Sequence, residues 1–291
     1  GEQGSRMLRV VLLLVFFCVP GARAADVLDE QAFTERYAAM LVSSYEGASV
    51  EVIGPLEVRV TGVGEESSTS FLDNAYGVYL SDPAELEGVL QRFVDSVGAM
   101  IADEDNTGDL ASLFPVIKDM SYIAQVREVM RTTEGADPDA PFPLYFEPLN
   151  SDLVVMYAFD SEASIRFASG EDIEALGIQG KELQIRALDN LLAYLPEIGR
   201  EGDDSLSMIL ADGNYEAALL LYDEIWSRDV FRVAGDIVVF VPARDVVLVT
   251  GSEDEEGLAR ARGLVSENDF SYAISPHAYV RTADGWARFE P

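Results

Sequence analysis

The stretch GDIVVFVPARDVVLVTG, residues 235–251, shows most directly how this chain folds. Two runs rich in Val, Ile and Phe flank four residues, Pro242, Ala243, Arg244 and Asp245. Apolar β-branched runs around a short polar break predict a β-hairpin. Proline fits the second position of a type I turn, because its ring fixes φ near the value needed there. The pattern therefore places Pro242 inside the turn and the Arg244–Asp245 pair at the turn's exit.

The rest of the chain alternates between helical and strand patterns without a repeating strand–helix–strand unit. Apolar residues at helical spacing predict helices over residues 29–45, 71–80, 84–101, 120–130, 171–176, 181–195, 215–226 and 255–265. Apolar runs and alternation predict strands over residues 49–54, 56–62, 112–119, 143–149, 152–160, 164–169, 205–211, 272–275, 277–282 and 286–290. This order predicts an α+β fold, with two lobes of mainly antiparallel sheets flanked by helices, rather than a doubly wound parallel fold.

An acidic stretch, DEDNTGD at residues 103–109, is the clearest linker in the sequence. It predicts a small N-terminal α+β lobe over residues 25–105 and a C-terminal α+β domain over residues 110–291.

The same linker resembles the start of a calcium-binding loop. Asp103, Asp105 and Thr107 stand at alternate positions, and Asp109 follows a glycine placed for the sharp turn. Phe114 stands where such a loop needs a bidentate Glu. We therefore interpret the segment as a solvated acidic linker and predict no metal site.

The first residues have the pattern of an export signal. Basic residues precede an apolar run at residues 10–19, and an A-x-A site ends at Ala24. This predicts a signal peptide over residues 1–24, cleaved between Ala24 and Ala25, with residues 1–6 interpreted as a tag or a misplaced start. The run is about half of the roughly 20 residues that a membrane-spanning helix needs. We expect a periplasmic or secreted protein that is not inserted in the membrane after cleavage.

The charge of the chain excludes several classes of partner. The sequence has 52 acidic and 20 basic residues, a net charge of −32, and cleavage would leave 51 against 17, a net charge of −34. Such a field repels phosphate backbones and anionic lipid, so neither nucleic-acid nor membrane-surface binding is expected. A hydrophobic content of 48% still predicts a folded core.

The cleaved chain would also lack several reactive side chains. The single cysteine lies in the predicted signal, which excludes disulfides, zinc–thiolate sites and a cysteine nucleophile in the mature chain. Only Lys118 and Lys181 are present, which leaves little room for lysine-based covalent chemistry. We predict no cofactor.

Two short motifs remain as candidates for a site. His277, the single histidine, stands close to Ser275 and could act as a lone general base, although an exposed strand histidine is the preferred interpretation. Asn214 is placed to cap the predicted helix that begins at Tyr215. An anion at that helix start is disfavoured by Glu216 and by the net charge.

Several segments of the C-terminal two thirds occur in a recognisable order. They are LFPVIKD, PLYFEPLNSDLVVMYAFD, IRALDNLLAYLP, ADGNYEAALLLYDEIW, the opening hairpin and YAISPHAYV. Together they resemble the bacterial YtpQ-like family, domain of unknown function 1444, from about Leu113 to Phe289. The family supplies no established activity and no catalytic residues. The resemblance implies that a polar turn recurs between the two hairpin strands, with Asp245 at a matching place.

The sequence therefore favours an exported, non-catalytic binding or accessory module with an unknown protein or small-molecule partner. The candidate binding loop consists of Arg244, Asp245, Asn214 and Tyr215. The alternative is a carboxylate- or metal-dependent hydrolase acting on extracytoplasmic material. An enzyme would show a deep pocket with converging carboxylates of displaced pKa. Binding would be favoured if Arg244 pointed into a cleft between lobes, and a simple turn if it covered only its own hairpin.

Overall fold

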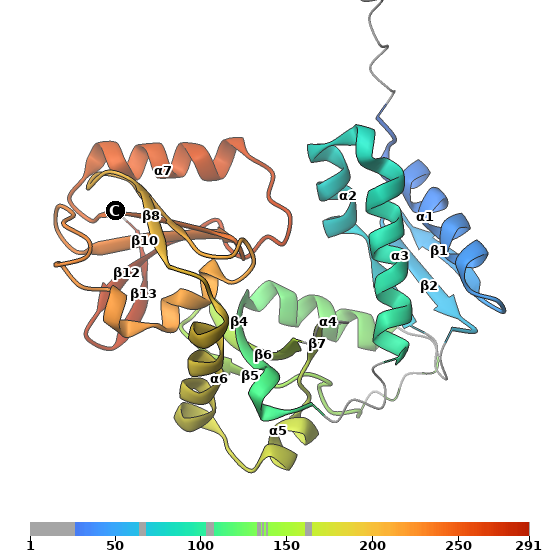
Figure 1. Ribbon diagram of the computed structural model, residues 1–291. Coiled ribbons are helices and arrows are strands. Elements are labelled where there is room, and N and C mark those ends of the chain that lie inside the picture. The colour runs from blue at the N-terminus through green and yellow to red at the C-terminus, as the bar shows by residue number, and fades with distance from the viewer. Residues whose placement is uncertain are drawn as a thin grey trace, which may run out of the picture.

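The computed structural model describes residues 27–63, 68–102, 108–132, 135, 137, 139–160 and 165–290 (Figure 1). These residues form three antiparallel sheets with helices packed on them, which confirms the predicted α+β class. Within this part of the chain no helix is both long and apolar enough to span a bilayer. The predicted signal peptide, with Ala24 and Ala25, lies outside the described residues.

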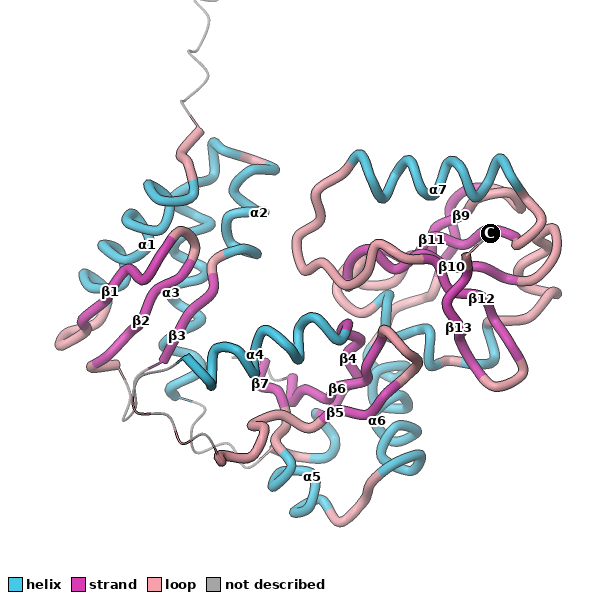
Figure 2. The backbone as a smooth tube through the Cα atoms, turned by 180° about the vertical axis from the view of Figure 1, so that it is seen from behind, coloured by secondary structure: helices cyan, strands magenta, loops and turns pink. Residues whose placement is uncertain are grey.

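The N-terminal sheet has the strand order β1-β2-β3, and α1 and α3 cover one of its faces (Figures 1 and 2). The elements are α1 (Glu30–Ser44), β1 (Ser49–Gly54), β2 (Glu57–Thr61), β3 (Ser68–Phe71), α2 (Asp73–Ser81), η1 (Pro83–Glu85) and α3 (Leu86–Ala102). The strands predicted over residues 49–54 and 56–62 form β1 and β2, which pair antiparallel. Strand β3 was not predicted, because its Ser and Thr residues give no apolar alternation.

The second sheet has the order β4-β6-β5, and β7 also pairs with β6. Its elements are η2 (Leu110–Ser112), β4 (Leu113–Asp119), α4 (Met120–Thr132), β5 (Phe146–Pro148), β6 (Leu153–Asp160), β7 (Ile165–Phe167), α5 (Gly170–Leu176) and α6 (Gly180–Tyr194). On β6, Tyr157 and its alternate neighbours face the main core, while Val154 and Met156 pack with Ile123 of α4 on the other face.

The third sheet has the order β13-β12-β10-β11-β9-β8. Its elements are β8 (Gly199–Gly202), β9 (Ser207–Leu210), η3 (Glu216–Leu221), η4 (Asp223–Ile225), β10 (Ile237–Ala243), β11 (Val246–Gly251), α7 (Glu255–Glu267), β12 (Ala278–Thr282) and β13 (Gly285–Phe289). One face packs on α7, where Phe240 meets Leu258. The opposite face, with Val239 and Val249, shares a single core with the second sheet. The division of the chain into two domains at the acidic linker stays a prediction.

The opening hairpin forms as predicted, but its turn lies two residues further along. Ala243 pairs with Val246, so Arg244 and Asp245 are themselves the two turn residues. Pro242 is buried in β10, where the register shifts between Phe240 and Ala243. Because proline has no N–H to donate, a bulge is one of the few sheet positions that accept it.

Two further predictions are wrong. The segment 215–226 forms the short 3-10 helices η3 and η4 rather than one amphipathic helix, and all six residues of η3 are buried. Apolar residues on every side of η3 remove the polar face that an amphipathic helix needs. The predicted strand at 272–275 reduces to a single bridge between Ala273 and Ala243.

Candidate functional site

Arg244 extends from the hairpin to segments outside its own strands. Its guanidinium carbon lies 3.5 Å from the ring centroid of Tyr272, in the loop between α7 and β12. Its Nη2 donates to Asn214 Oδ1 at 3.0 Å. The backbone N–H of Arg244 donates to Tyr272 O at 3.2 Å, and Ala217 N donates to Arg244 O at 2.9 Å. The turn is therefore held by two other segments of the chain.

Tyr272 links this place to helix α2. Its φ of 55° is in the left-handed region, which is uncommon for a bulky residue and costs about 1–3 kcal/mol. Tyr272 N donates to Asn74 Oδ1 of α2 at 2.8 Å. Gly77 of α2 approaches so closely that a Cβ there would lie 2.7 Å from Ser271 Oγ. Helix α2 thus touches the loop that carries Tyr272, the residue on which Arg244 stacks.

Lys118 lies at the end of β4 and is half-buried. Its Nζ lies 4.9 Å from the ring centroid of Tyr122 and 6.0 Å from that of Phe167. Burial, and secondly the Arg244 guanidinium, lower the pKa of the Lys118 amine, while Asp119 acts in the opposite direction. Asp119 itself accepts from Tyr122 N at 3.2 Å and from Ser121 Oγ at 2.6 Å, so it caps α4. We call Lys118, Arg244, Tyr122, Tyr272 and Asn214 the basic cluster.

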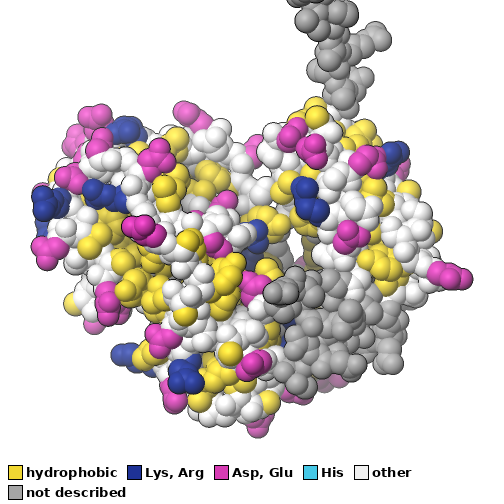
Figure 3. All heavy atoms as spheres, viewed as in Figure 1, with side chains coloured by type: hydrophobic (Ala, Val, Ile, Leu, Met, Phe, Trp, Pro, Cys, Tyr) yellow, Lys and Arg dark blue, Asp and Glu magenta, His cyan; other side chains and the backbone are white. Residues whose placement is uncertain are grey.

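The basic cluster is exceptional in its lack of counterions. Of the Lys and Arg residues that the structure describes, Lys118 and Arg244 alone are half-buried and have no carboxylate oxygen of another described residue within 4.0 Å. The sheltered Arg59, Arg166 and Arg281 each form an ion pair. Figure 3 shows a hollow in the middle of the face drawn, and dark blue Lys or Arg atoms are visible inside it.

The turn beside Arg244 is built by two carboxylates. Asp212 Oδ1 accepts from the N–H groups of Asn214 and Tyr215, both at 3.0 Å. Glu216, only 3% exposed, folds back so that its Oε1 accepts from Ala211 N at 2.9 Å and Gly213 N at 2.8 Å. Asn214 was predicted to cap a helix here. Instead, its side chain accepts the hydrogen bond from Arg244.

Three buried polar atoms of this region have no hydrogen-bond partner within the described part of the chain. They are Asp212 Oδ2, Glu216 Oε2 and Arg244 Nε. An unsatisfied buried polar atom costs about 1–3 kcal/mol. All three atoms lie at the hairpin turn or at the adjoining turn, which marks this region as a place of unused hydrogen-bonding capacity.

The other predicted site residues lie apart from one another. Tyr215 is buried, and its hydroxyl donates to Asp160 Oδ2 at 2.5 Å; burial and this carboxylate raise the pKa of the phenol. Asp245 is exposed in the turn. In the predicted linker, Asp109 caps η2 through Ala111 N at 3.1 Å, while Asp103, Asp105 and Thr107 lie outside the described residues. No group of three His, Cys, Asp or Glu residues in the described ranges could hold a metal ion.

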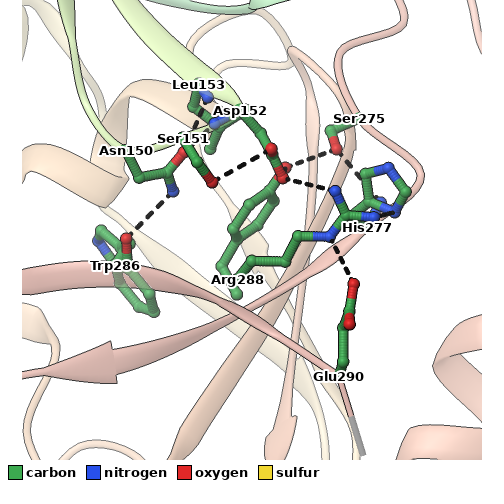
Figure 4. A network of polar contacts seen from close by, with 10 residues as sticks. Asn150, Ser151, Asp152, Leu153, Ser275, His277, Trp286, Arg288 and Glu290 are labelled. Atoms are coloured by element: carbon green, nitrogen blue, oxygen red, sulfur yellow. Dashed lines mark hydrogen bonds and ion pairs between the residues drawn. The ribbon is translucent and has the colours of Figure 1, made fainter.

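His277 belongs to a second polar group, the Asp152 network, made of Asp152, Ser275, His277, Tyr279 and Arg288. Figure 4 labels all of these except Tyr279. Arg288 Nη1 contacts Asp152 Oδ2 at 3.3 Å, and its Nε contacts Glu290 at 3.2 Å. Tyr279 OH donates to Asp152 Oδ2 at 3.3 Å and shares a hydrogen bond of 2.7 Å with Ser275 Oγ. Every charge drawn here has a partner of the opposite sign.

The geometry does not make His277 a general base for Ser275. The histidine contacts Ser275 Oγ through its backbone N–H, at 3.2 Å. Its ring Nδ1 lies 3.0 Å from Arg288 Nη2, and because a guanidinium only donates, Nδ1 accepts. The cavity beside the ring has a volume of about 230 Å³ and is lined partly by Arg262, Arg288 and Glu290. Drug-sized ligands occupy roughly 300–1,000 Å³.

The carboxyl groups give no sign of a general acid. Where a carboxyl pKa is displaced among the described residues, it is lowered. Arginine partners act on Glu128 and Asp172, and backbone N–H groups act on Asp203 in a turn and on Asp254 at the start of α7. A hydrolase acid needs a raised pKa.

Sequence reasoning missed Lys118 and Tyr272, because neither belongs to a motif. Lys118 lies at the end of an apolar strand in a chain with very few lysines, and this is the signal that could have pointed to it.

The fold and site define an α+β protein with a half-buried basic cluster whose Lys118 and Arg244 form no ion pair with any other described residue. The chain is similar to proteins named UPF0354, an uncharacterised family. They include relatives in Bacillus cytotoxicus (22% identical, covering 60% of each chain), Listeria monocytogenes (24%, covering 60% of this chain and 62% of the relative) and Bacillus anthracis (23%, covering 64% and 68%). The chain thus spans about 60% of the length of the first two. No protein-family model matches it, and neither does a solved structure. The narrower YtpQ-like assignment stays a prediction.

Proposed function

We propose that this protein is a binding module that takes a small anion, carrying a carboxylate or phosphate group, at the basic cluster. One observation carries the proposal: Lys118 and Arg244 are half-buried cations with no carboxylate oxygen of the described residues within 4.0 Å, in a chain with 52 acidic residues. Sheltered charges are normally paired, because desolvation is otherwise uncompensated. An anion held by both side chains would supply the missing counterion.

The local cations outweigh the net charge of the protein at the distance of contact. At 4 Å and an effective dielectric constant of about 20, two unit charges interact by about 4 kcal/mol. The many surface carboxylates act through water, where interactions beyond about 10 Å are largely screened at 0.1 M salt. The net charge therefore slows the approach of an anion more than it weakens the bound state.

The two cations offer complementary donors. Lys118 supplies a compact ammonium, whereas Arg244 supplies a planar fork suited to a carboxylate or phosphate. Tyr272 holds the guanidinium plane from one side, and Asn214 fixes Nη2. Such a preorganised fork loses less side-chain entropy when it binds.

Isothermal titration calorimetry at low ionic strength tests the proposal directly. We expect phosphate or lactate to bind the wild type, and Lys118→Met to weaken binding at least about tenfold, which corresponds to about 1.4 kcal/mol. Lys181→Met is the matched control, because Lys181 is exposed at the start of α6. Absence of binding to the wild type, or equal weakening by both substitutions, would refute the proposal.

Export is a separate proposal, supported by the pattern at residues 7–25. N-terminal sequencing after cell fractionation tests it. A mature chain that begins at Ala25 outside the cytoplasm is expected, and an intact Met7 in the cytoplasm contradicts it. The hydrolase alternative gains no support from the lowered carboxyl pKa values.

A further inference from the structure

We infer that a cavity at the C-terminal end of α7 binds a small molecule with an apolar body and a primary ammonium group. We call it the α7 cavity; it is lined by Pro242, Val265, Asn268, Asp269, Phe270 and Ile274, among others. Its volume is about 310 Å³, at the lower end of the roughly 300–1,000 Å³ of small-molecule sites. The inference is independent of the basic cluster and of the anion proposed to bind there.

The apolar walls of the α7 cavity come from three segments of the chain. Val265 lies in the last turns of α7, Pro242 lies in β10, and Ile274 belongs to the loop between α7 and β12. Ile274 N donates to Pro242 O at 2.8 Å, which ties this loop to β10. Pro242 and Ile274 are buried, whereas Val265 and Phe270 are half-buried. The cavity therefore offers a preformed apolar surface to the body of a ligand.

The polar part of the α7 cavity favours a cation. Asp269 forms no ion pair with another described residue. Asn268 Nδ2 donates to Leu264 O at 2.8 Å, so its Oδ1 is the side-chain atom left to accept a hydrogen bond. The last turn of α7 contains no basic residue, although the C-terminal end of a helix carries a partial negative charge. An ammonium group at this place would interact favourably with both the helix end and Asp269.

The cavity beside His277 has the opposite chemistry. Both cavities reach Pro276, but Arg262 and Arg288 line the cavity beside His277, whereas no Lys or Arg lines the α7 cavity. An ammonium group is therefore better placed in the α7 cavity. A free small molecule suits it better than a protein partner does. Protein interaction sites expose extended apolar patches, whereas residues 266–269 beside this cavity are polar and exposed.

Nuclear magnetic resonance tests the inference on the full chain, labelled with 15N and titrated with phenethylamine. The phenyl ring of this probe matches the apolar walls, and its amine is protonated at neutral pH. 2-Phenylethanol has the same apolar body without the charge. We expect saturable shifts of the Phe270 and Ile274 amide signals, with 2-phenylethanol binding about three- to tenfold more weakly than phenethylamine. Equal affinities for the two probes would overturn the inference.

Two pairs of variants locate the ligand. Val265→Trp should fill the cavity and weaken binding of both probes at least about tenfold, or about 1.4 kcal/mol. Leu264→Trp, at an exposed position of α7, is its control. Asp269→Asn should weaken binding of phenethylamine about two- to fivefold and leave 2-phenylethanol unchanged. Asp284→Asn removes the same charge from the exposed turn between β12 and β13, and should change neither affinity.

Three results would overturn the inference. The first is absence of saturable phenethylamine binding to the folded wild type. The second is equal weakening by the two members of either pair, because a general attraction of amines to a chain with a net charge of −32 would not distinguish Asp269 from Asp284. The third is loss of phenethylamine binding in Lys118→Met, which would place the ligand at the basic cluster. Unchanged binding in Lys118→Met supports a separate site.

Discussion

The basic cluster and the Asp152 network present the same chemical groups in opposite arrangements. In the network, Arg288 lies between the carboxylates of Asp152 and Glu290. In the cluster, Arg244 lies on a tyrosine ring and acts on a second cation, Lys118. The network holds the histidine, serine and aspartate that a search for catalytic residues would choose first. The charged side chains of the network nevertheless pair with one another, so the network stabilises β12 and β13. The cations of the basic cluster form no ion pair with other described residues, so they are available to bind a ligand.

The largest expected effect on stability is in the network. Asp152→Ala removes the acceptor of Tyr279 OH and a counterion of Arg288, and should lower the free energy of unfolding by about 1–3 kcal/mol. Burial raises the pKa of Tyr279 to about 12, so its phenol stays a donor at neutral pH. Urea denaturation measures the loss. Anion binding at the basic cluster should remain unchanged in the folded variant, and a parallel loss of binding would contradict the separation of the two regions.

The same arginine substitution should affect ligand binding in only one region. Arg244→Met should weaken binding of lactate or phosphate by about tenfold or more, equal to about 1.4 kcal/mol. Arg262→Met, beside the His277 cavity, is the matched control and should leave the affinity unchanged. Calorimetry on both variants measures these affinities. If Arg262→Met weakened binding more than Arg244→Met, the anion site would lie at the His277 cavity instead.

The fold could be predicted further than the site, for a physical reason. The strands of the hairpin follow from continuous Val and Ile runs, because periodicity is a property of neighbouring residues. The predicted position of the turn was wrong, because a proline such as Pro242 fits both a type I turn and a bulge. The pairing of Ala243 with Val246 in the structure distinguishes these two possibilities. Segment 215–226 has apolar spacing that suits an amphipathic α-helix. In the structure every residue of η3 is buried, so the solvent-exposed polar face that such a helix needs is absent from η3.

The candidate site was predicted only in part. Arg244 and Asn214 were chosen from the sequence, and the structure brings them to 3.0 Å. Lys118 was not chosen, because the property that distinguishes it is the absence of a counterion. That absence depends on which carboxylates of distant segments come near, and no spacing along the chain encodes it.

Removal of the charge of Lys118 should stabilise the protein. Lys118→Met keeps the aliphatic length, relieves the desolvation of the amine and ends its repulsion with Arg244. We expect a gain of about 0.5–2 kcal/mol in the free energy of unfolding, at the cost of anion binding. Lys181→Met should change stability by less than about 0.5 kcal/mol. Urea denaturation gives both values, and destabilisation by Lys118→Met would show that the amine is structural.

The stabilisation should also depend on pH in one direction. Because the folded-state pKa of Lys118 is lowered, the unfolded chain binds more protons between that pKa and about 10.4. The wild type is therefore most penalised at low pH and regains stability as the pH rises through this window. The advantage of Lys118→Met should shrink between pH 7 and 10. An advantage that grew with pH would mean that the pKa is raised instead.

The smallest effect is expected at the turn itself. Asp245 is exposed, so Asp245→Ala should change the free energy of unfolding by less than about 0.5 kcal/mol. Loss of one negative charge near Arg244 should tighten anion binding slightly, measured by calorimetry. A large loss of affinity would instead make Asp245 part of the binding machinery.

A crystal structure with selenate tests the central claim most directly, because the anion resembles sulfate and phosphate and is located by its anomalous signal. We expect a selenate peak within about 3.2 Å of both the Lys118 ammonium and an Arg244 guanidinium nitrogen. The peak should vanish in Lys118→Met crystals and persist in Lys181→Met crystals. Selenate found only beside Arg262 and His277, with none between Lys118 and Arg244, would contradict it.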